Sequence, residues 1–353
     1  MTIQKLLREN IRKLKAYSSA REEEGFKTAN IYLDANENGF YKELNRYPDP
    51  LQRKLKKEIS SWRNVTAEQV FIGNGSDEII DLFIRAFCEP GKESILVNPP
   101  TYGMYEVCAN VNGVEVEKVN LTSGFQLDVA SIWNQISEKT KLIFICSPNN
   151  PTGNRLKIPD IVEILTRFNG LVILDEAYVD FSIAGSLLPL INQFKNLVVL
   201  QTLSKAWGLA GIRLGMAFAD KEIVEVLTKI KFPYNVNAIS QQIACEKIKK
   251  ERDGFYEIIQ RVLRQRNYLR QELSGLSFVE KVFPSDANFL LVKVEDPKGL
   301  YAYLRKKQIL IRDRSGEPGC EGCVRITVGK PSENKKLLTA MKEFEKSTCC
   351  TLV

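Results

Sequence analysis

The sequence predicts an α/β fold: a large, doubly wound and mostly parallel sheet, followed by a smaller α+β domain. Over residues 70–220, short apolar runs alternate with helical patterns, as they do when strands alternate with crossover helices. From about residue 221 the pattern is helical, and short strand-like runs return only near residue 289. A chain of 353 residues is long enough for two domains that each bury a core.

The composition is that of an ordinary globular protein, with 44% hydrophobic and 26% charged residues. The net charge of +7 is spread out, because acids and apolar residues interrupt the basic stretches at 54–58 and 247–252, so we expect no nucleic-acid partner. No apolar run approaches the ~20 residues of a membrane span. Charged residues occupy the N-terminus, where a signal peptide needs an apolar stretch. We therefore expect a cytoplasmic protein with no membrane partner.

The eight cysteines show no disulfide framework, so we expect reduced thiols. Cys320 and Cys323 form a C-x-x-C pair, and Cys349 and Cys350 are adjacent. Four thiols could bind zinc, but an adjacent pair lacks the usual ligand spacing, and we predict no metal site. The chain contains no histidine, which excludes imidazole-based mechanisms and leaves lysine, tyrosine and carboxylates for proton transfer.

The first part of the chain is charged, with a short helical pattern before residue 31. Residues 31–38 begin apolar and continue with side chains that favour turns. The prolines of residues 46–50 lead into a predicted helix over 51–63. Residues 66–69 resemble a capping box, although too little chain follows for a long helix.

Residues 70–83 predict a strand, a glycine turn and an amphipathic helix. A helix N-terminus offers free N–H groups and a positive dipole end, so one phosphate group fits near Gly75, Ser76 and Asp77. The stretch lacks the Gly-Lys-Ser/Thr of a Walker loop and the third glycine of a dinucleotide fingerprint. The alternative is an ordinary βα turn.

Three further predicted strands end in polar residues, and a helical pattern over 158–168 separates the second from the third. Parallel strands end on one edge of a sheet, so we expect these exits to converge there. The strands and their exits are 95–97 with 98–105, 141–146 with 147–153, and 171–174 with 175–178.

The stretch over residues 200–215 is the most informative. An apolar run at 197–200 predicts a buried strand that ends in hydroxyl residues and then Lys205, at the position where open sheets bind ligands. Arg213 follows eight residues later. A lysine whose pKa is lowered by burial and a cationic neighbour is a usable nucleophile, and we predict that Lys205 binds an aldehyde cofactor covalently. The alternative is a surface lysine in a loop.

The C-terminal part predicts a helix over 221–230, a break at 232–237 and one long helix from Ile239 to Leu263. Short strands follow at 289–292, 310–311 and 324–328, with helices over 300–307 and 332–344. We divide the chain into an N-terminal arm (1–40) that packs with the small domain and the active site, a large domain (41–235), and a linking helix with the small domain (236–353).

Six motifs then occur in a recognisable order. Together they resemble the pyridoxal-phosphate enzymes of fold type I, specifically aminotransferases, and among these the histidinol-phosphate aminotransferases. The resemblance runs from Tyr17 to the last helix and is more specific for fold and cofactor than for substrate. Gly39 departs from the proline expected there, which bears on loop stiffness only. The motifs are Leu-Asp-Ala-Asn-Glu-Asn (33–38), Arg-Tyr-Pro-Asp-Pro (46–50), Asn-Asn-Pro-Thr-Gly (149–153), Asp-Glu-Ala-Tyr (175–178), Thr-Leu-Ser-Lys (202–205) and Arg-Ile-Thr-Val-Gly (325–329).

The resemblance implies a role for each cofactor-binding residue. Lys205 binds pyridoxal 5′-phosphate covalently and moves a proton between the substrate and the cofactor. Asp175 pairs with the ring nitrogen and keeps it protonated, so that the ring accepts electrons. Tyr178 and Asn150 bind the ring 3-oxygen, and Tyr102 stacks on the ring. The phosphate is bound by Gly75, Ser76, Asp77, Thr202, Ser204 and Arg213.

The resemblance also implies a homodimer, because Tyr47 reaches the phosphate in the partner subunit. Arg325 binds the carboxylate of glutamate, and Arg312, Tyr17 and Asn36 join it in holding histidinol phosphate. The implied reaction moves the amino group of L-histidinol phosphate to 2-oxoglutarate, by a ping-pong mechanism, in histidine biosynthesis. The alternatives are an aminotransferase for aromatic or other amino acids and a decarboxylase of phosphorylated threonine. A non-catalytic regulator on this fold would carry an added DNA-binding domain, for which we expect no residues left over.

Overall fold

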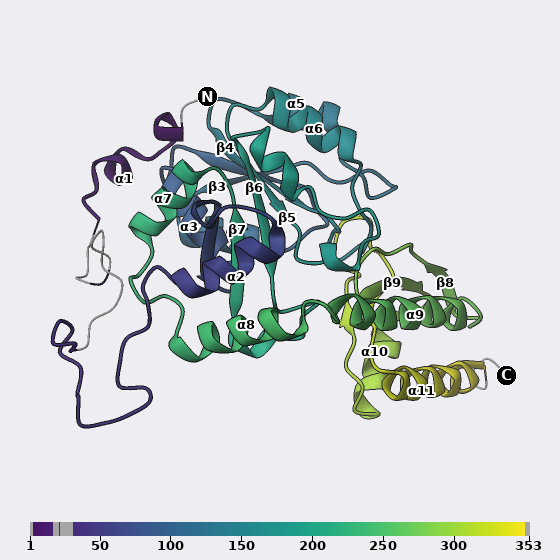
Figure 1. The fold of residues 1–353 in the computed structure, drawn as a ribbon. Coiled ribbons are helices and arrows are strands. Elements are labelled where there is room, and N and C mark those ends of the chain that lie inside the picture. Colours follow the sequence, from purple (N-terminus) through teal and green to yellow (C-terminus); the bar gives the residue numbers. More distant parts are fainter. Residues whose placement is uncertain (1–2, 17–20, 22–30, 350–353) are drawn as a thin grey trace.

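The computed structural model describes residues 3–16, 21 and 31–349. It contains a seven-stranded sheet with helices on both faces and a separate four-stranded sheet, which packs against the last three helices of the described chain (Figure 1). The large sheet has the strand order β1-β7-β6-β5-β4-β2-β3. Its strands are β1 (Val70–Asn74), β2 (Ser94–Val97), β3 (Glu115–Lys118), β4 (Thr140–Cys146), β5 (Leu171–Asp175), β6 (Leu197–Thr202) and β7 (Leu214–Phe218).

The large sheet is mostly parallel, as predicted. The ladder from β6 through β5, β4 and β2 to β3 is parallel throughout, and only β7 runs antiparallel to its neighbours β1 and β6. The sequence analysis missed β3 and β7. Both are short, and β3 alternates charged residues with valine in a pattern of low hydrophobicity. The α/β fold class is confirmed.

The central strands β4, β5 and β6 are mostly apolar and almost entirely buried, because both faces of the sheet are covered. Successive side chains of a strand point to opposite faces, so Ile143 and Ile145 belong to one core, whereas Leu142 and Phe144 belong to the other. One face packs against α2 (Arg53–Arg63), α5 (Val129–Gln135), α6 (Ile158–Arg167) and α8 (Ala238–Glu251). The opposite face packs against α3 (Ser76–Phe87), α4 (Met104–Val111) and α7 (Lys221–Ile230).

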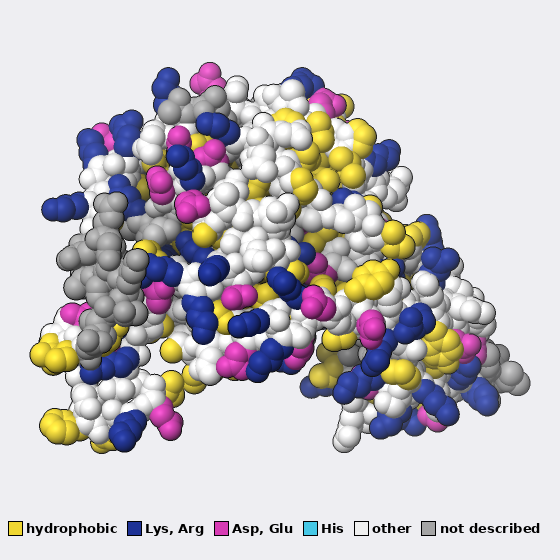
Figure 2. Space-filling view, viewed as in Figure 1, with side chains coloured by type: hydrophobic (Ala, Val, Ile, Leu, Met, Phe, Trp, Pro, Cys, Tyr) yellow, Lys and Arg dark blue, Asp and Glu magenta, His cyan; other side chains and the backbone are white. Residues whose placement is uncertain are grey.

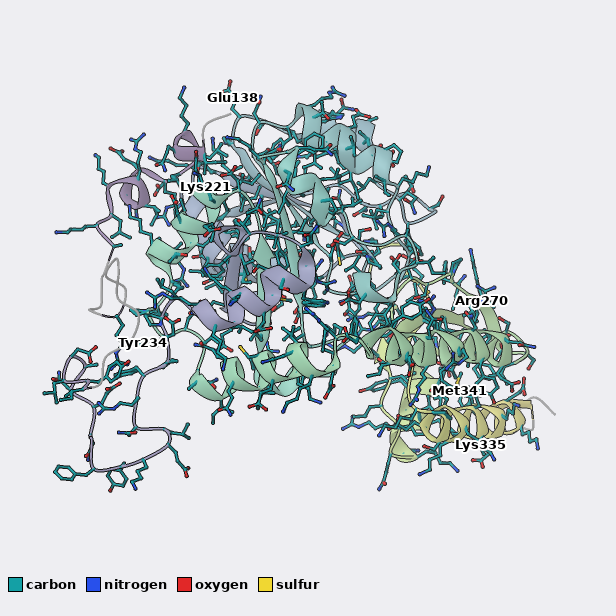
Figure 3. The ribbon with its side chains drawn as sticks, viewed as in Figure 1. Glu138, Lys221, Tyr234, Arg270, Lys335 and Met341 are labelled. Carbon is teal, nitrogen blue, oxygen red and sulfur yellow. The ribbon has the colours of Figure 1, made fainter. Side chains whose placement is uncertain are left out.

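The small unit contains the four-stranded sheet in the order β10-β11-β9-β8, with antiparallel pairing throughout. Its strands are β8 (Val279–Val282), β9 (Phe289–Val294), β10 (Arg312–Asp313) and β11 (Cys323–Thr327), and its later helices are α10 (Pro297–Lys306) and α11 (Pro331–Cys349). The buried Met341 of α11 shares a core with Leu269 and Val292 (Figure 3). This unit is the predicted α+β part.

The single long helix predicted after residue 238 is wrong. The structure has two helices, α8 and α9 (Phe255–Leu273), separated by residues 252–254. Gly254 lies at the N-terminal end of α9, where its low helix propensity favours an interruption. The break predicted at 232–237 is confirmed, because Asn237 caps α8 by accepting a 2.8 Å hydrogen bond from the Ser240 N–H.

The described part of the N-terminal arm contacts the large unit. Ile3, in the short helix η1 (Ile3–Lys5), is buried in the core on the α3 side, and Arg8 forms a 3.4 Å ion pair with Glu89. Helix α1 (Glu9–Lys13) follows, and its Ile11 carbonyl accepts a hydrogen bond from Lys229. None of the described helices is long and apolar enough to cross a membrane.

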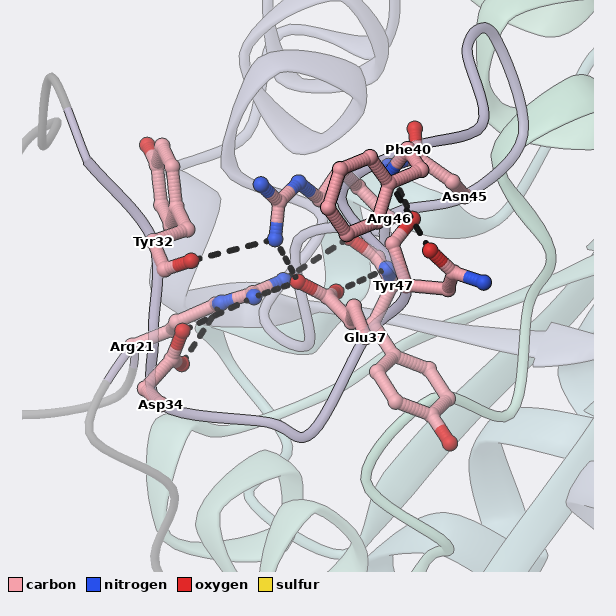
Figure 4. Close-up of polar contacts among 9 residues, drawn as sticks. Arg21, Tyr32, Asp34, Glu37, Phe40, Asn45, Arg46 and Tyr47 are labelled. Carbon is pink, nitrogen blue, oxygen red and sulfur yellow. Dashed lines mark hydrogen bonds and ion pairs between the residues drawn. The ribbon is translucent and has the colours of Figure 1, made fainter.

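Residues 31–50 form a long loop held by one buried carboxylate (Figure 4). The side chain of Glu37 is only 3% exposed. Its Oε2 accepts hydrogen bonds from Arg21 Nη2 at 2.8 Å and Arg46 Nη1 at 2.7 Å, and its Oε1 accepts one from the Tyr47 backbone N–H at 2.6 Å. Arg21 also pairs with Asp34. Burial opposes ionisation, but these donors lower the pKa of Glu37 to about 2.

Candidate active site

The polar strand ends meet at one cavity on the edge of the large sheet. Because β1, β2, β4, β5 and β6 run in the same direction, their C-terminal ends open on the same side. The lining residues come from all five exits. They are Ser76, Asp77, Tyr102, Cys146, Asn150, Asp175, Ala177, Tyr178, Thr202, Ser204, Lys205, Ala210 and Arg213.

Asp175, the last residue of β5, is a buried carboxylate, 3% exposed. Its Oδ2 accepts a 2.6 Å hydrogen bond from Tyr105 Oη, and its Oδ1 accepts a 3.0 Å bond from the Ala177 N–H. Burial raises the pKa of Asp175, and these two donors oppose that rise. Within the described residues no Lys or Arg forms an ion pair with Asp175. The Asp175 carboxylate therefore has room for a cationic partner, such as the protonated nitrogen of an aromatic ring in a ligand.

Lys205 follows β6 and lines the same cavity. Its Nζ lies 5.6 Å from the centre of the Tyr178 ring. Partial burial and then the charge of Arg325 lower the pKa of Lys205, which is the direction a nucleophilic amine requires. The burial is only partial, however, because the side chain keeps contact with solvent within an open cavity.

Three polar side chains surround these two residues. Tyr178 is buried, and its ring lies edge-on to that of Phe289 with centroids 5.1 Å apart. Burial raises the pKa of the Tyr178 hydroxyl, so the hydroxyl stays neutral and can donate a hydrogen bond. Asn150 is buried, and its Oδ1 accepts a hydrogen bond from Arg325 Nη1. Tyr102 donates a 2.9 Å hydrogen bond to Asp77, with its ring at the cavity wall.

The turn between β1 and α3 forms an anion site. Gly75 has φ +81°, and a Cβ there would meet Arg213 Nη2 at 2.7 Å, so glycine lets the guanidinium approach the start of the helix. A Cβ on Gly215 would collide with the Ser76 N–H. Arg213 also lies 3.4 Å from Asp77. Free N–H groups in the first turn of α3 and the Arg213 guanidinium together suit a phosphate.

Thr202 shapes the loop that carries Lys205. Its hydroxyl donates to the Leu214 carbonyl and accepts from the Ser204 N–H, both at 3.1 Å. The hydroxyl of Thr202 is thus engaged in joining β6 to β7, while Ser204 and Thr202 both line the cavity.

Two predicted substrate residues lie on neighbouring strands of the small sheet. Arg312 of β10 pairs in register with Arg325 of β11. Arg325 is half-buried, lies 5.2 Å from the centre of the Phe289 ring and reaches Asn150 at the cavity. Burial lowers the pKa of Arg325. Arg312 is exposed beside it.

Two predicted residues, Asn36 and Tyr47, lie outside this cavity. Asn36 and Tyr47 line a separate groove, where the Tyr47 ring stacks on Tyr234 with centroids 4.4 Å apart. Figure 3 shows Tyr234 on the side of the molecule where the loop of residues 31–50 lies. Tyr17 lies outside the described residues.

The sequence analysis missed two residues at the site. Tyr105 follows Tyr102 by three residues, and this helical spacing could have placed both side chains on one face. Arg314 follows Arg312 by two residues, and its charge contributes to the lowered pKa of Arg325. No strand pattern marks Arg314, because β10 ends at Asp313.

The residues of the cavity fit pyridoxal phosphate. Lys205 supplies an amine for the aldehyde, Asp175 a buried anion for the ring nitrogen, and the Gly75 turn with Arg213 a cradle for the phosphate. Within the described residues, no group of three or more Cys, Asp or Glu side chains is arranged to hold a metal ion.

Comparisons with known proteins agree with this fit. The sequence profile described as aminotransferase class I and II matches residues 21–341. The histidinol-phosphate aminotransferase of Cytophaga hutchinsonii is 52% identical over 97% of this chain and 99% of its own. The crystal structure of the histidinol-phosphate aminotransferase from Clostridium acetobutylicum has a TM-score of 0.79 and 28% identity, covering 86% of this chain and 92% of that one.

A second structure extends the comparison of folds. The histidinol-phosphate aminotransferase from Sinorhizobium meliloti, solved in complex with pyridoxal 5′-phosphate, has a TM-score of 0.79 at 21% identity, covering 89% of this chain and 90% of that one. The resemblance drawn from the sequence motifs is confirmed. The cofactor is pyridoxal 5′-phosphate. The chain belongs to the aminotransferase class I and II family.

Proposed function

We propose that this enzyme transfers the amino group of L-histidinol phosphate to 2-oxoglutarate, giving imidazole-acetol phosphate and L-glutamate in histidine biosynthesis. The observation that carries the proposal is the pairing of Arg312 with Arg325 beside a cavity that also contains Lys205 and Asp175. The two substrates carry different anions, a phosphate and a carboxylate, and adjacent arginines suit both in turn. The near full-length relatives described above support the same substrate.

Pyridoxal phosphate, when bound, supplies an aldehyde that takes up the amino group and a ring that accepts electrons. The Lys205 amine is placed to take a proton from the substrate Cα and return it, because it stands on the loop after β6 and its lowered pKa favours the neutral base. Asp175 would hold the ring nitrogen in its protonated form. Tyr178 and Asn150 would donate hydrogen bonds to the ring oxygen, and Tyr102 would pack against the ring.

The phosphate of the cofactor would be held by the start of α3. Gly75, Ser76 and Asp77 contribute backbone N–H groups, Arg213 a guanidinium and Ser204 a hydroxyl, while the Thr202 hydroxyl, already bonded to the Leu214 carbonyl, orients this loop at the phosphate site. These groups fix one end of the cofactor and so position its reactive end against Lys205. In this assignment Arg325 receives the carboxylate of glutamate, and Arg312, Asn36 and Tyr17 help to hold the phosphorylated substrate.

We further propose that the active form is a homodimer. Tyr47 and Asn36 line a groove separate from the cavity of their own chain, which supports a role for Tyr47 in the site of a second chain. The loop that carries them exposes large apolar side chains, including Phe40 (100% exposed), Leu33 (90%) and Leu44 (65%). Figure 2 shows hydrophobic side chains exposed at the lower left, where Figure 1 places the loop of residues 31–50. Exposed apolar groups of this size favour burial in an interface.

The cytoplasm is the proposed location. Six cysteines in the described residues are free and buried, which suits a reducing compartment. The division into an arm (1–40), a large domain (41–235) and a small domain with its linking helices (236–353) stays a proposal.

The test is turnover with a panel of amino donors. Purified enzyme loaded with pyridoxal phosphate is mixed with histidinol phosphate, an aromatic amino acid, glutamate or phosphothreonine, with 2-oxoglutarate present. We expect the highest kcat/KM for histidinol phosphate, with glutamate as the product. No turnover of histidinol phosphate at millimolar concentration would contradict the proposal. Preferred turnover of aromatic substrates, or release of carbon dioxide from phosphothreonine, would instead establish one of the two alternatives.

A further inference from the structure

Tyr105 is a buried polar residue that the mechanism above does not use. It lies near the N-terminal end of α4, has no exposed surface, and stacks on Phe144 of β4 with ring centroids 4.8 Å apart. The Tyr102 ring meets it edge-on at 5.6 Å. These contacts fix the tyrosine ring, and its hydroxyl points to Asp175, with Oη 2.6 Å from Oδ2.

The hydroxyl completes a two-point clamp on the Asp175 carboxylate. Tyr105 holds Oδ2 and the Ala177 N–H holds Oδ1, so rotation of the carboxylate is restricted from both sides. Both groups are donors, and a donor stabilises the charged form of a carboxyl group. Desolvation works in the opposite direction at this buried position. The tyrosine hydroxyl therefore opposes the protonation that burial favours.

We propose that Tyr105 is a positioning residue that keeps Asp175 ionised and oriented, and thereby keeps the proton on the cofactor's ring nitrogen. The inference rests on the proposed function, in which Asp175 pairs with that nitrogen. A single proton is shared between the nitrogen and the carboxylate. Stabilising the carboxylate leaves the proton on the nitrogen, and removing the Tyr105 hydroxyl moves it toward Asp175. A less protonated ring accepts electrons less well, so Lys205 removes the Cα proton more slowly.

The test is Tyr105→Phe, which removes the hydroxyl and retains the ring that packs on Phe144. The matched control is Tyr303→Phe, which removes a tyrosine hydroxyl from a 3.2 Å contact with Glu343 on the surface of the small unit. The main readout is the nitrogen-15 NMR shift of the ring nitrogen in bound, isotope-labelled pyridoxal phosphate. In Tyr105→Phe we expect a shift toward neutral pyridine, and kcat lower by about tenfold with KM changed by less than about twofold. Tyr303→Phe should match the wild type.

A second variant covers the case in which Tyr105→Phe does not fold. Fluorotyrosine at position 105 has a more acidic hydroxyl and is a stronger donor, so the nitrogen-15 shift should move further toward the protonated form. A wild-type shift in either folded variant overturns the inference, as does a change in KM alone. A wild-type enzyme that binds no pyridoxal phosphate would refute the proposed function instead, so the two failures are distinguishable.

Discussion

Arg325 of β11 donates a hydrogen bond through Nη1 to the side-chain oxygen of Asn150, a residue 175 positions earlier in the chain. The contact joins the small sheet to the turn after β4, at the cavity. A second contact reinforces it, because the Asp286 N–H donates a 2.7 Å hydrogen bond to the Gly153 carbonyl in the same turn. Arg325 is therefore held against the cavity by bonds between the small unit and the turn after β4.

The two arginines should have separable effects on the two substrates. We expect Arg312→Ala to raise KM for histidinol phosphate by about 10- to 100-fold through loss of a charge-assisted contact, and KM for glutamate much less. Steady-state kinetics with each donor measure the ratio. Arg305→Ala, on the neighbouring helix α10, is the control and should leave both values unchanged. Equal effects on both donors would show that Arg312 does not discriminate between them.

Lys205→Ala should abolish transamination. The loss of an amine that acts both as nucleophile and as proton carrier should lower kcat by at least about 10²- to 10⁴-fold. Borohydride reduction of the loaded wild type should attach the cofactor to the peptide that contains Lys205, as mass spectrometry can show. Lys221→Ala, at the start of α7, is the control. Full activity in Lys205→Ala, or label on another lysine, would remove the central assignment.

The pH at which Lys205 reacts should depend on Arg325. Burial first, and then the Arg325 charge, lower the pKa of Lys205, so the neutral amine is available at lower pH than for a free lysine. Arg325→Met removes the second cause, so the pKa should rise and covalent loading should require higher pH. The rate of cofactor trapping by borohydride across a pH series gives the midpoint. A midpoint equal to that of the wild type would show that the Arg325 charge does not affect the pKa of Lys205.

Glu37 should control stability in acid. Its lowered pKa means that the contribution of its ion pairs is complete above about pH 4.5 and is lost as the pH falls toward about 2. We expect Glu37→Gln to lower the free energy of unfolding by about 2 kcal/mol at neutral pH and to reduce the loss of stability between these two values. Denaturant unfolding at a series of pH values measures both. Glu43→Gln, exposed in the same loop, should behave as the wild type.

Complementation between subunits tests the role of Tyr47. A mixed dimer of Lys205→Ala and Tyr47→Ala chains contains one site with both native residues if Tyr47 serves the partner's cavity. Random pairing of the two variants should therefore recover about a quarter of the wild-type activity. If Tyr47 serves its own chain, every site lacks one residue and no activity returns. Refolding each variant alone is the control.

The sequence predicted the large sheet and its cavity because both follow from local patterns. When parallel strands end in polar residues, those residues are expected to gather at one edge of the sheet. The strand exits at Gly75, Asp175 and Lys205 do meet there. The exposure of Lys205 could not be predicted in this way. It depends on how widely the cavity opens, which the packing of the loop and the small sheet decides.

Other features depend on contacts between distant segments. The Tyr105 hydroxyl reaches Asp175 across 70 residues, and no local pattern encodes that distance. The split between α8 and α9 has only a weak signal, since residues 252–254 interrupt an otherwise continuous helical pattern. The roles predicted for Asn36 and Tyr47 rested on the resemblance, and the role proposed for Tyr47 requires a second chain.

The residues proposed to hold the cofactor and the arginines proposed to hold the substrates stand on different sheets, and this separation bears on how new specificities arise. Changes in β10 and β11 can alter which anion is recognised while the turn at Gly75 and the Lys205 loop keep their geometry. Mutational drift in the small sheet can therefore explore new amino donors without loss of the chemistry. Directed evolution toward other donors should accordingly concentrate its libraries on residues 310–326.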